Sequence, residues 1–260
     1  MGRFSNLEFE GKDPLREEPQ APGELRDEHY YLRLADQDYR VARFDRALRY
    51  YSRALESNAN VLPAWVGQVQ MLIELGEYKE AKLWSDKALE LHRDNPDLLS
   101  VKSTAWARQG DPQKAIEFSD AALAQRGPTP LVWLARGEAL MAGGQSNDAH
   151  CLEKAASESK QDWFMQLRIG RVFYAYRQFA QAMTWVSKAV QQEPAAPFAL
   201  HVMGDCQLAL GFASSAEHSY RQATSIDRDF ALSRSALDGL AGRGVLDRLW
   251  TGVRGFLRRR

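Results

Sequence analysis

Five histidines and two cysteines give this 260-residue sequence its widest range of possible chemistry. The histidines form no HExxH motif, and none adjoins a serine nucleophile motif. His201 and Asp205 are one helical turn apart, but such a pair is more typical of a surface or groove hydrogen bond than of a metal site. Cys151 and Cys206 form no CxxC spacing, which favours core packing in a reducing compartment over redox chemistry.

No motif for nucleotide or cofactor binding accompanies these residues. The sequence contains neither GxxxxGK[ST] nor a GxGxxG after a strand, and no segment has a convincing strand pattern. We therefore expect no catalytic residue, no cofactor and no metal. Because 34 basic residues balance 34 acidic ones, no global field attracts nucleic acid, which we expect not to be a partner. The lack of an apolar run of about 18 residues and of a signal-peptide core predicts a cytoplasmic protein.

The dominant regularity is a pair of alanines seven residues apart, which recurs six times. The first alanines of successive pairs are 34, 34, 34, 33 and 34 residues apart. Seven residues is close to two helical turns, so each pair places two small side chains on one helix face, where a neighbouring helix can approach. This periodicity predicts an array of helical repeats. The pairs are Ala47/Ala54, Ala81/Ala88, Ala115/Ala122, Ala149/Ala156, Ala182/Ala189 and Ala216/Ala223.

Each repeat contains two helical patterns joined by a tight turn. Glycine marks most of these turns, because it adopts the left-handed conformation that ends a helix. In the first and fifth repeats Ala42-Arg43 and Arg177-Gln178 stand there instead, so those turns are less clearly signalled. The glycines are Gly76, Gly110, Gly143, Gly144 and Gly211.

Several positions match the tetratricopeptide repeat (TPR) family. Trp133 with Gly137 resembles the opening of its 34-residue pattern, and Ile169-Gly170 and Met203-Gly204 resemble its apolar-glycine pair. The resemblance covers roughly residues 28–230. It implies an all-α superhelical solenoid of about six repeats with a C-terminal capping helix. The departures from the pattern are Ala35, Val69 and Ser103 at the usual glycine position, and Pro112 at a usual aromatic one.

The repeat frame divides the chain into nine segments. We predict a disordered arm over 1–27, a capping helix over 230–241 and an Arg-rich amphipathic helix over 242–260. The six repeats are predicted at 28–61, 62–95, 96–129, 130–162, 163–196 and 197–229.

In the resembled family the first helices line a concave groove that receives a peptide or a partner helix. One hypothesis is an apolar pocket of Leu134, Phe164, Tyr174 and Phe198 rimmed by arginines, which suits a hydrophobic anchor beside an acidic group. The alternative is that these aromatics pack between repeats. The groove residues implied by family position are Arg33, Asp36, Arg40, Gln70, Glu74, Arg108, Leu134, Glu138, Phe164, Arg168, Arg171, Tyr174, Phe198 and His201.

The C-terminal segment is a second candidate for function. Its apolar stripe and arginine cluster suit an anionic membrane surface or an acidic partner, or the stripe docks on the end of the solenoid. The residues expected to make this contact are Trp250, Arg254, Phe256, Arg258, Arg259 and Arg260.

Taken together, these patterns predict a non-catalytic adaptor or scaffold that holds a protein or peptide partner in its groove. The alternative is a membrane-associated assembly factor or chaperone, peripheral at the inner membrane surface and recruited through its basic C-terminal helix. The oligomeric state is left open.

Overall fold

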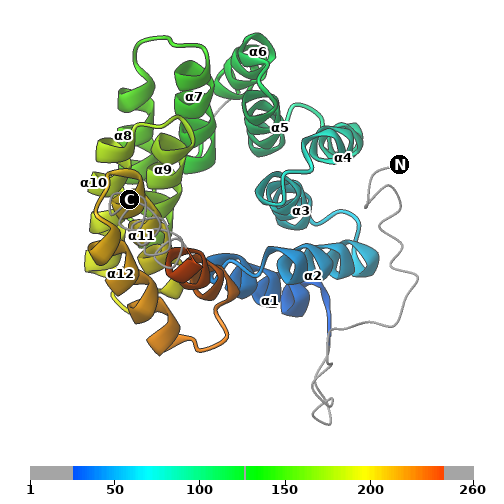
Figure 1. The fold of residues 1–260 in the computed structure, drawn as a ribbon. Coiled ribbons are helices and arrows are strands. Elements are labelled where there is room, and N and C mark those ends of the chain that lie inside the picture. The colour runs from blue at the N-terminus through cyan, green and yellow to red at the C-terminus, as the bar shows by residue number, and fades with distance from the viewer. Residues whose placement is uncertain (1–25, 126, 243–260) are drawn as a thin grey trace, which may run out of the picture. The chain divides into compact units, whose positions relative to one another are not determined.

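A computed structural model of the chain describes residues 26–125 and 127–242. Every regular element in these two ranges is a helix, and the helices follow one another as antiparallel pairs (Figure 1). The all-α solenoid class expected from the sequence is confirmed. The labelled helices are α1 (Glu28–Arg40), α2 (Phe44–Ser57), α3 (Leu62–Glu74), α4 (Tyr78–Leu91), α5 (Pro96–Gln109), α6 (Pro112–Leu123), α7 (Pro130–Ala142), α8 (Asp148–Glu158), α9 (Trp163–Ala175), α10 (Phe179–Gln192), α11 (Pro197–Ala209) and α12 (Ala213–Ile226).

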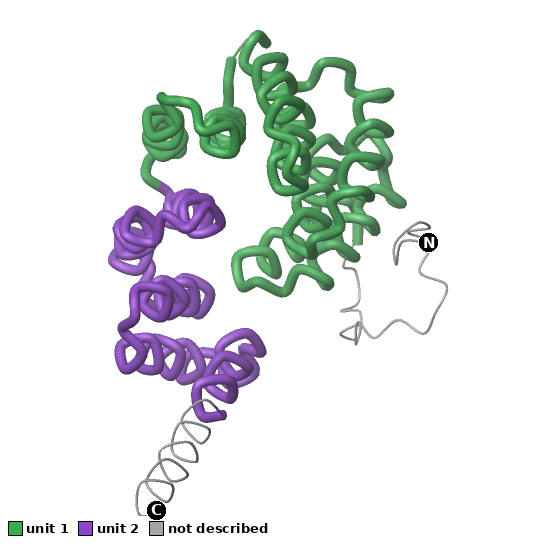
Figure 2. Tube along the Cα trace, turned by 45° about the horizontal axis from the view of Figure 1, so that its top comes forward, with its two compact units in different colours: residues 1–161 green, residues 162–260 purple. Residues whose placement is uncertain are grey.

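The chain forms two compact units (Figure 2). Unit 1 spans residues 1–161 and contains four helix pairs, α1 to α8. Unit 2 spans residues 162–260 and contains two pairs, α9 to α12. A further helix over residues 231–242 follows them. The arm predicted over 1–27 lies outside the described residues except for its last two positions, and so does all but the first residue of the helix predicted over 242–260.

Local sequence signals explain where the helices begin. Asp27, Asn95, Asp111 and Thr129 each accept a hydrogen bond from a backbone N–H in the first turn of the helix they precede. Proline opens α5, α6, α7 and α11, where its missing N–H costs no helical hydrogen bond. Pro112, a departure from the family pattern, is thus the first residue of α6.

The turns within pairs depend on left-handed backbone conformations. Gly76, Gly110 and Gly211 have φ between +80° and +91°, as the sequence predicted for a helix end. In the first and fifth pairs Ala42 (φ +57°) and Arg177 (φ +61°) adopt the same conformation. All these turns therefore share one geometry, although two of them carry a Cβ that the left-handed region disfavours.

Each pair is held together by matched side-chain sizes across its two helices. Where the first helix has glycine, the facing residue of the second helix is large. A Cβ added to Gly204 would lie 2.7 Å from Cδ1 of Tyr220, and one added to Gly170 would lie 2.6 Å from Cγ2 of Val186. Ser103, at the glycine position of the third repeat, lies sixteen residues before Ser119, and both are buried. In the third repeat, therefore, a first-helix residue larger than glycine is accompanied by a small residue at the equivalent second-helix position.

Ion pairs at equivalent positions join successive pairs in unit 1. Lys102 Nζ lies 2.5 Å from Asp86 Oδ1, and Arg136 Nη1 lies 2.7 Å from Asp120 Oδ1. Each ion pair links the second helix of one repeat to the first helix of the next. The residues of the second ion pair lie 34 positions after those of the first. Both aspartates are 56% exposed, so we expect each bridge to contribute modestly to stability, about 0–1 kcal/mol.

The fourth repeat departs from the alanine pattern. Ala149 is exposed, whereas the first alanines of the other five repeats are fully buried. Leu152 packs under Gly137 instead, and Ala155 is fully buried beside Ala156. The expectation that Ala149 packs at the helix interface is therefore wrong. The physical reason is a longer turn before α8, which begins only at Asp148, so that the helix faces its neighbour in a different register.

Candidate partner-binding surface

The first helices of unit 1 form one layer. Helix α3 contacts both α1 and α5, and α5 also contacts α7. The second helices α2, α4 and α6 each pack between the first helix of their own pair and that of the next. The open side of the first-helix layer is therefore a continuous surface to which four repeats contribute.

Helix α1 presents charged residues on this layer. Arg33, Asp36 and Arg40 are all exposed. The Tyr51 hydroxyl donates a hydrogen bond of 2.6 Å to Asp36 Oδ1, which orients the carboxylate. Three of the residues implied by the TPR resemblance thus lie on one helix with their charged groups accessible.

The groove positions of α3, α5 and α7 are less exposed. Gln70 and Glu74 are half-buried, and the Tyr39 hydroxyl donates to Glu74 Oε1 at 3.4 Å. Arg108 Nε donates to Glu138 Oε1, and the Glu138 residue is only 2% exposed. Glu138 is therefore an internal partner of Arg108, and its assignment as a surface residue of the groove is corrected.

The apolar pocket proposed for the second half is not an open feature of unit 2. Phe164 and Phe198 are 7% and 3% exposed, and the guanidinium carbon of Arg171 lies 5.0 Å from the centroid of the Phe198 ring. Leu134 is 5% exposed and belongs to unit 1. The alternative interpretation, that these aromatics pack in the interior, fits Phe164 and Phe198. Whether such a side chain is buried depends on residues about one repeat away in the sequence. The helical pattern of a single repeat does not specify those contacts.

The half-buried groove residues of unit 2 are Arg168, Arg171 and Tyr174. The side chain of Arg168 makes no hydrogen bond or ion pair with any described residue. The Tyr174 ring lies 5.4 Å from the ring of Phe179 on the paired helix, and burial raises the pKa of its hydroxyl. Arg168 is thus the residue of this set most available to an acidic partner.

His201 anchors the terminal helix. Its Nδ1 lies 3.1 Å from Ser233 Oγ, and its Nε2 lies 3.4 Å from Asp205 Oδ2. The Tyr220 hydroxyl donates to the other oxygen of Asp205 at 2.7 Å, and the ring of Phe230 lies 5.8 Å from that of His201. Burial, assisted by the charge of Arg171, lowers the pKa of His201, although Asp205 opposes the shift. His201 therefore packs beneath residues 231–242 as a neutral side chain.

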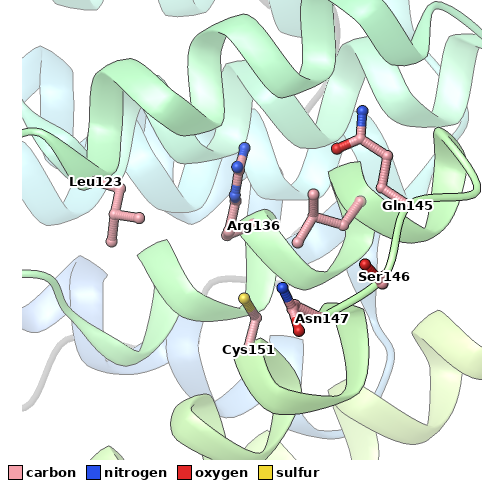
Figure 3. A pocket seen from close by; sticks show the side chains of 7 residues that line it. Leu123, Arg136, Gln145, Ser146, Asn147 and Cys151 are labelled. Atoms are coloured by element: carbon pink, nitrogen blue, oxygen red, sulfur yellow. The ribbon is translucent and has the colours of Figure 1, made fainter.

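Sequence reasoning did not identify a crevice in unit 1. We name it the α7–α8 crevice: it has a volume of about 490 Å³ and is lined by α6, α7, α8 and the turn between α7 and α8 (Figure 3). The signal that could have revealed it is the Gly143-Gly144 pair in an unusually long turn, next to the one 33-residue spacing between alanines. The lining residues are Leu123, Arg136, Leu140, Gln145, Ser146, Asn147 and Cys151.

Several other expectations concern residues beyond this surface. The predicted contact residues of the C-terminal segment, from Trp250 to Arg260, lie outside the described residues. Within residues 26–125 and 127–242, no cluster of three or more His, Cys, Asp or Glu side chains is arranged to hold a metal ion. In the same ranges, no helix combines the length and hydropathy needed to cross a bilayer.

Known structures share the fold at low sequence identity. A tetratricopeptide repeat protein from Parabacteroides merdae matches with a TM-score of 0.53 and 16% identity, over 82% of this chain and 84% of that one. The Cut9–Hcn1 hetero-tetramer of the APC/C matches with a TM-score of 0.50 and 14% identity, over 82% of this chain and 43% of that one. Human IFIT1 bound to m7Gppp-AAAA matches with a TM-score of 0.53 and 16% identity, over 69% of this chain and 46% of that one. These likenesses establish the fold alone.

A family model described as "Tetratricopeptide repeat" matches residues 12–162, more than half of the chain. This match agrees with the helix pairs, the shared turn geometry and the size-matched helix interfaces described above. Proteins built from these repeats bind protein or peptide partners. The chain belongs to the tetratricopeptide repeat family.

Proposed function

We propose that this protein is a non-catalytic adaptor that binds a segment of a partner protein across the first-helix layer of unit 1. The observation that carries the proposal is the continuity of that layer from α1 to α7, with accessible charges at Arg33, Asp36 and Arg40. A protein segment laid across it can contact several repeats at once, and charged rims contribute specificity and association rate. Arg168 and Arg171 offer a second basic contact in unit 2.

Affinity capture with paired variants tests this proposal. Full-length protein is used as bait in native lysate, and captured proteins are identified by mass spectrometry. We expect partners recovered with the wild type to be lost with Arg33→Glu/Arg40→Glu. The control, Lys79→Glu/Lys87→Glu, makes the same change of charge on exposed residues of the second helix α4 and should retain them. Equal recovery by both variants, or loss in the control alone, would contradict the proposed surface.

The contribution of unit 2 is tested separately. We expect Arg168→Glu/Arg171→Glu to weaken binding of a partner identified in this way, measured by calorimetry with purified proteins. Unchanged affinity would remove unit 2 from the site and leave the surface of unit 1 in place.

A second candidate function is recruitment to a membrane through the basic C-terminal segment. The repeat spacing places the alanine positions of a seventh second helix at 250 and 257, where the sequence has Trp250 and Leu257. Bulky side chains there do not suit the close helix approach seen in the other repeats, so the segment is suited to another contact. Each basic residue near an anionic surface contributes about 1 kcal/mol.

Co-sedimentation with anionic liposomes tests recruitment. We expect full-length protein to pellet with the liposomes and a 1–244 truncation to stay in the supernatant, and we expect added salt to reduce pelleting. Equal pelleting of the two proteins would exclude this role for the segment. A cytoplasmic location, peripheral at the inner membrane surface, is part of this proposal.

A further inference from the structure

The α7–α8 crevice exists because the fourth repeat breaks the register of the array. Five residues separate α7 from α8, compared with three between α9 and α10. Asn147, the last residue of this turn, has a left-handed backbone (φ +75°) although it is not glycine. Ala149 faces solvent as a result, and Cys151 instead turns its thiol toward the crevice. The opening is therefore a local feature of unit 1.

The crevice combines an apolar part with uncharged polar groups. Leu123 from α6 and Leu140 from α7 supply the apolar side chains. The guanidinium of Arg136 is already matched, because it lies 2.7 Å from the Asp120 carboxylate and donates to Ser119 Oγ at 2.8 Å. The site thus offers no uncompensated positive charge to an acidic ligand.

The turn supplies hydrogen-bonding groups that the described part of the protein leaves unused. The side chains of Gln145, Ser146 and Asn147 are exposed and make no hydrogen bond to any described residue. Asn147 precedes α8 as its N-cap, yet its side chain does not cap the helix. Primary amides both donate and accept, so they complement the N–H and C=O groups of a peptide backbone.

We propose that the α7–α8 crevice binds an extended, uncharged peptide segment of a partner protein. One aliphatic side chain of the segment packs against Leu123 and Leu140, and its backbone bonds to the amides of Gln145 and Asn147. The volume of about 490 Å³ lies within the range of about 300–1,000 Å³ that is usual for ligand sites. Helix α7 contributes to both surfaces, but none of the residues that line the crevice is a groove position of the first-helix layer. The crevice can therefore hold a second partner segment.

The two cysteines provide a built-in reporter of occupancy. Cys151 lines the crevice and is 5% exposed, whereas Cys206 is fully buried in unit 2. Burial raises the pKa of both thiols, that of Cys206 to about 12. Slow alkylation of Cys151 in the folded protein therefore reports access to the crevice, and Cys206 serves as the protected reference.

The test pans a phage-displayed library of random heptapeptides against the full-length protein. Recovered peptides are synthesised and tested for slowing the alkylation of Cys151 by iodoacetamide, followed by mass spectrometry. We expect aliphatic, uncharged sequences that slow alkylation severalfold at saturation. Ser146→Trp, which fills the crevice from an exposed position, should abolish binding. Gln113→Trp, an exposed tryptophan at the start of α6, should not.

A second variant tests the same site without adding a large side chain such as that of Ser146→Trp. Gln145→Ala/Asn147→Gly removes both amides while glycine suits the backbone at 147, and loss of two hydrogen bonds should weaken binding about tenfold or more. Circular dichroism verifies that each variant is folded. The proposal is overturned if panning yields no peptide that protects Cys151, if the selected sequences are charged, or if Ser146→Trp binds as well as the wild type.

Discussion

Replacing Gly204 with alanine tests the size matching within helix pairs. The added Cβ would lie 2.7 Å from Cδ1 and 2.9 Å from Cζ of Tyr220, closer than real Cβ contacts come. The Tyr220 ring cannot easily withdraw, because its hydroxyl donates a hydrogen bond of 2.7 Å to Asp205 and its ring centroid lies 5.4 Å from that of His201. Overpacking of this kind costs about 1–3 kcal/mol, whereas alanine gains about 1 kcal/mol over glycine in a helix.

Because the ring is held on two sides, we expect an overpacking cost near the upper end of that range, about 2–3 kcal/mol. After the gain of about 1 kcal/mol from helix propensity, the net loss of stability is about 1–2 kcal/mol. For a chain of this size that corresponds to a fall in Tm of roughly 2–4 °C per kcal/mol. Gly239→Ala is the matched control, since nothing lies within 4 Å of its added Cβ. It should stabilise the protein by about 0.5–1 kcal/mol through helix propensity alone. Urea and thermal denaturation, followed by circular dichroism, measure both changes.

A double-mutant cycle separates the clash from other effects. In a Tyr220→Ser background, which copies the serine at the facing position of the third repeat, Gly204→Ala should become stabilising by about 1 kcal/mol. The reasoning is refuted if Gly204→Ala behaves like the Gly239 control, or if it destabilises equally with and without the tyrosine.

Three further predictions follow from the geometry of single residues. Ala42→Gly and Arg177→Gly should each stabilise the protein by about 0.5–1 kcal/mol in urea denaturation, because both residues have a left-handed backbone. Burial lowers the pKa of His201, so the unfolded chain binds more protons. The stability that the neutral His201 contributes should therefore be fully present above about pH 6.5 and be lost as the pH falls below it. His201→Gln should reduce the dependence of the free energy of unfolding on pH in this range. Iodoacetamide should modify Cys151 before Cys206 in the folded protein, as quantified by mass spectrometry, and equal rates would contradict the burial of Cys206.

Much of the fold follows from the sequence alone. The alanine spacing identifies the repeats, and Gly76, Gly110 and Gly211 mark turns that the structure shows as left-handed. These signals are local: a helix period, a backbone preference and a cap each depend on residues within a few positions of one another. For the same reason Ala42 and Arg177 were weaker signals, because only the completed turn holds a Cβ in that conformation.

Only the tertiary structure decided which predicted surface residues are accessible. Phe198 and Glu138 occupy groove positions by family pattern, yet one is covered by packing and the other is bonded to Arg108. The exposure of Ala149, and with it the α7–α8 crevice, likewise depends on how α8 meets α7 after a lengthened turn. Burial is set by contacts between residues that are 15 to 35 positions apart. Periodicity in a single sequence fixes the face of a helix, but not what lies against it.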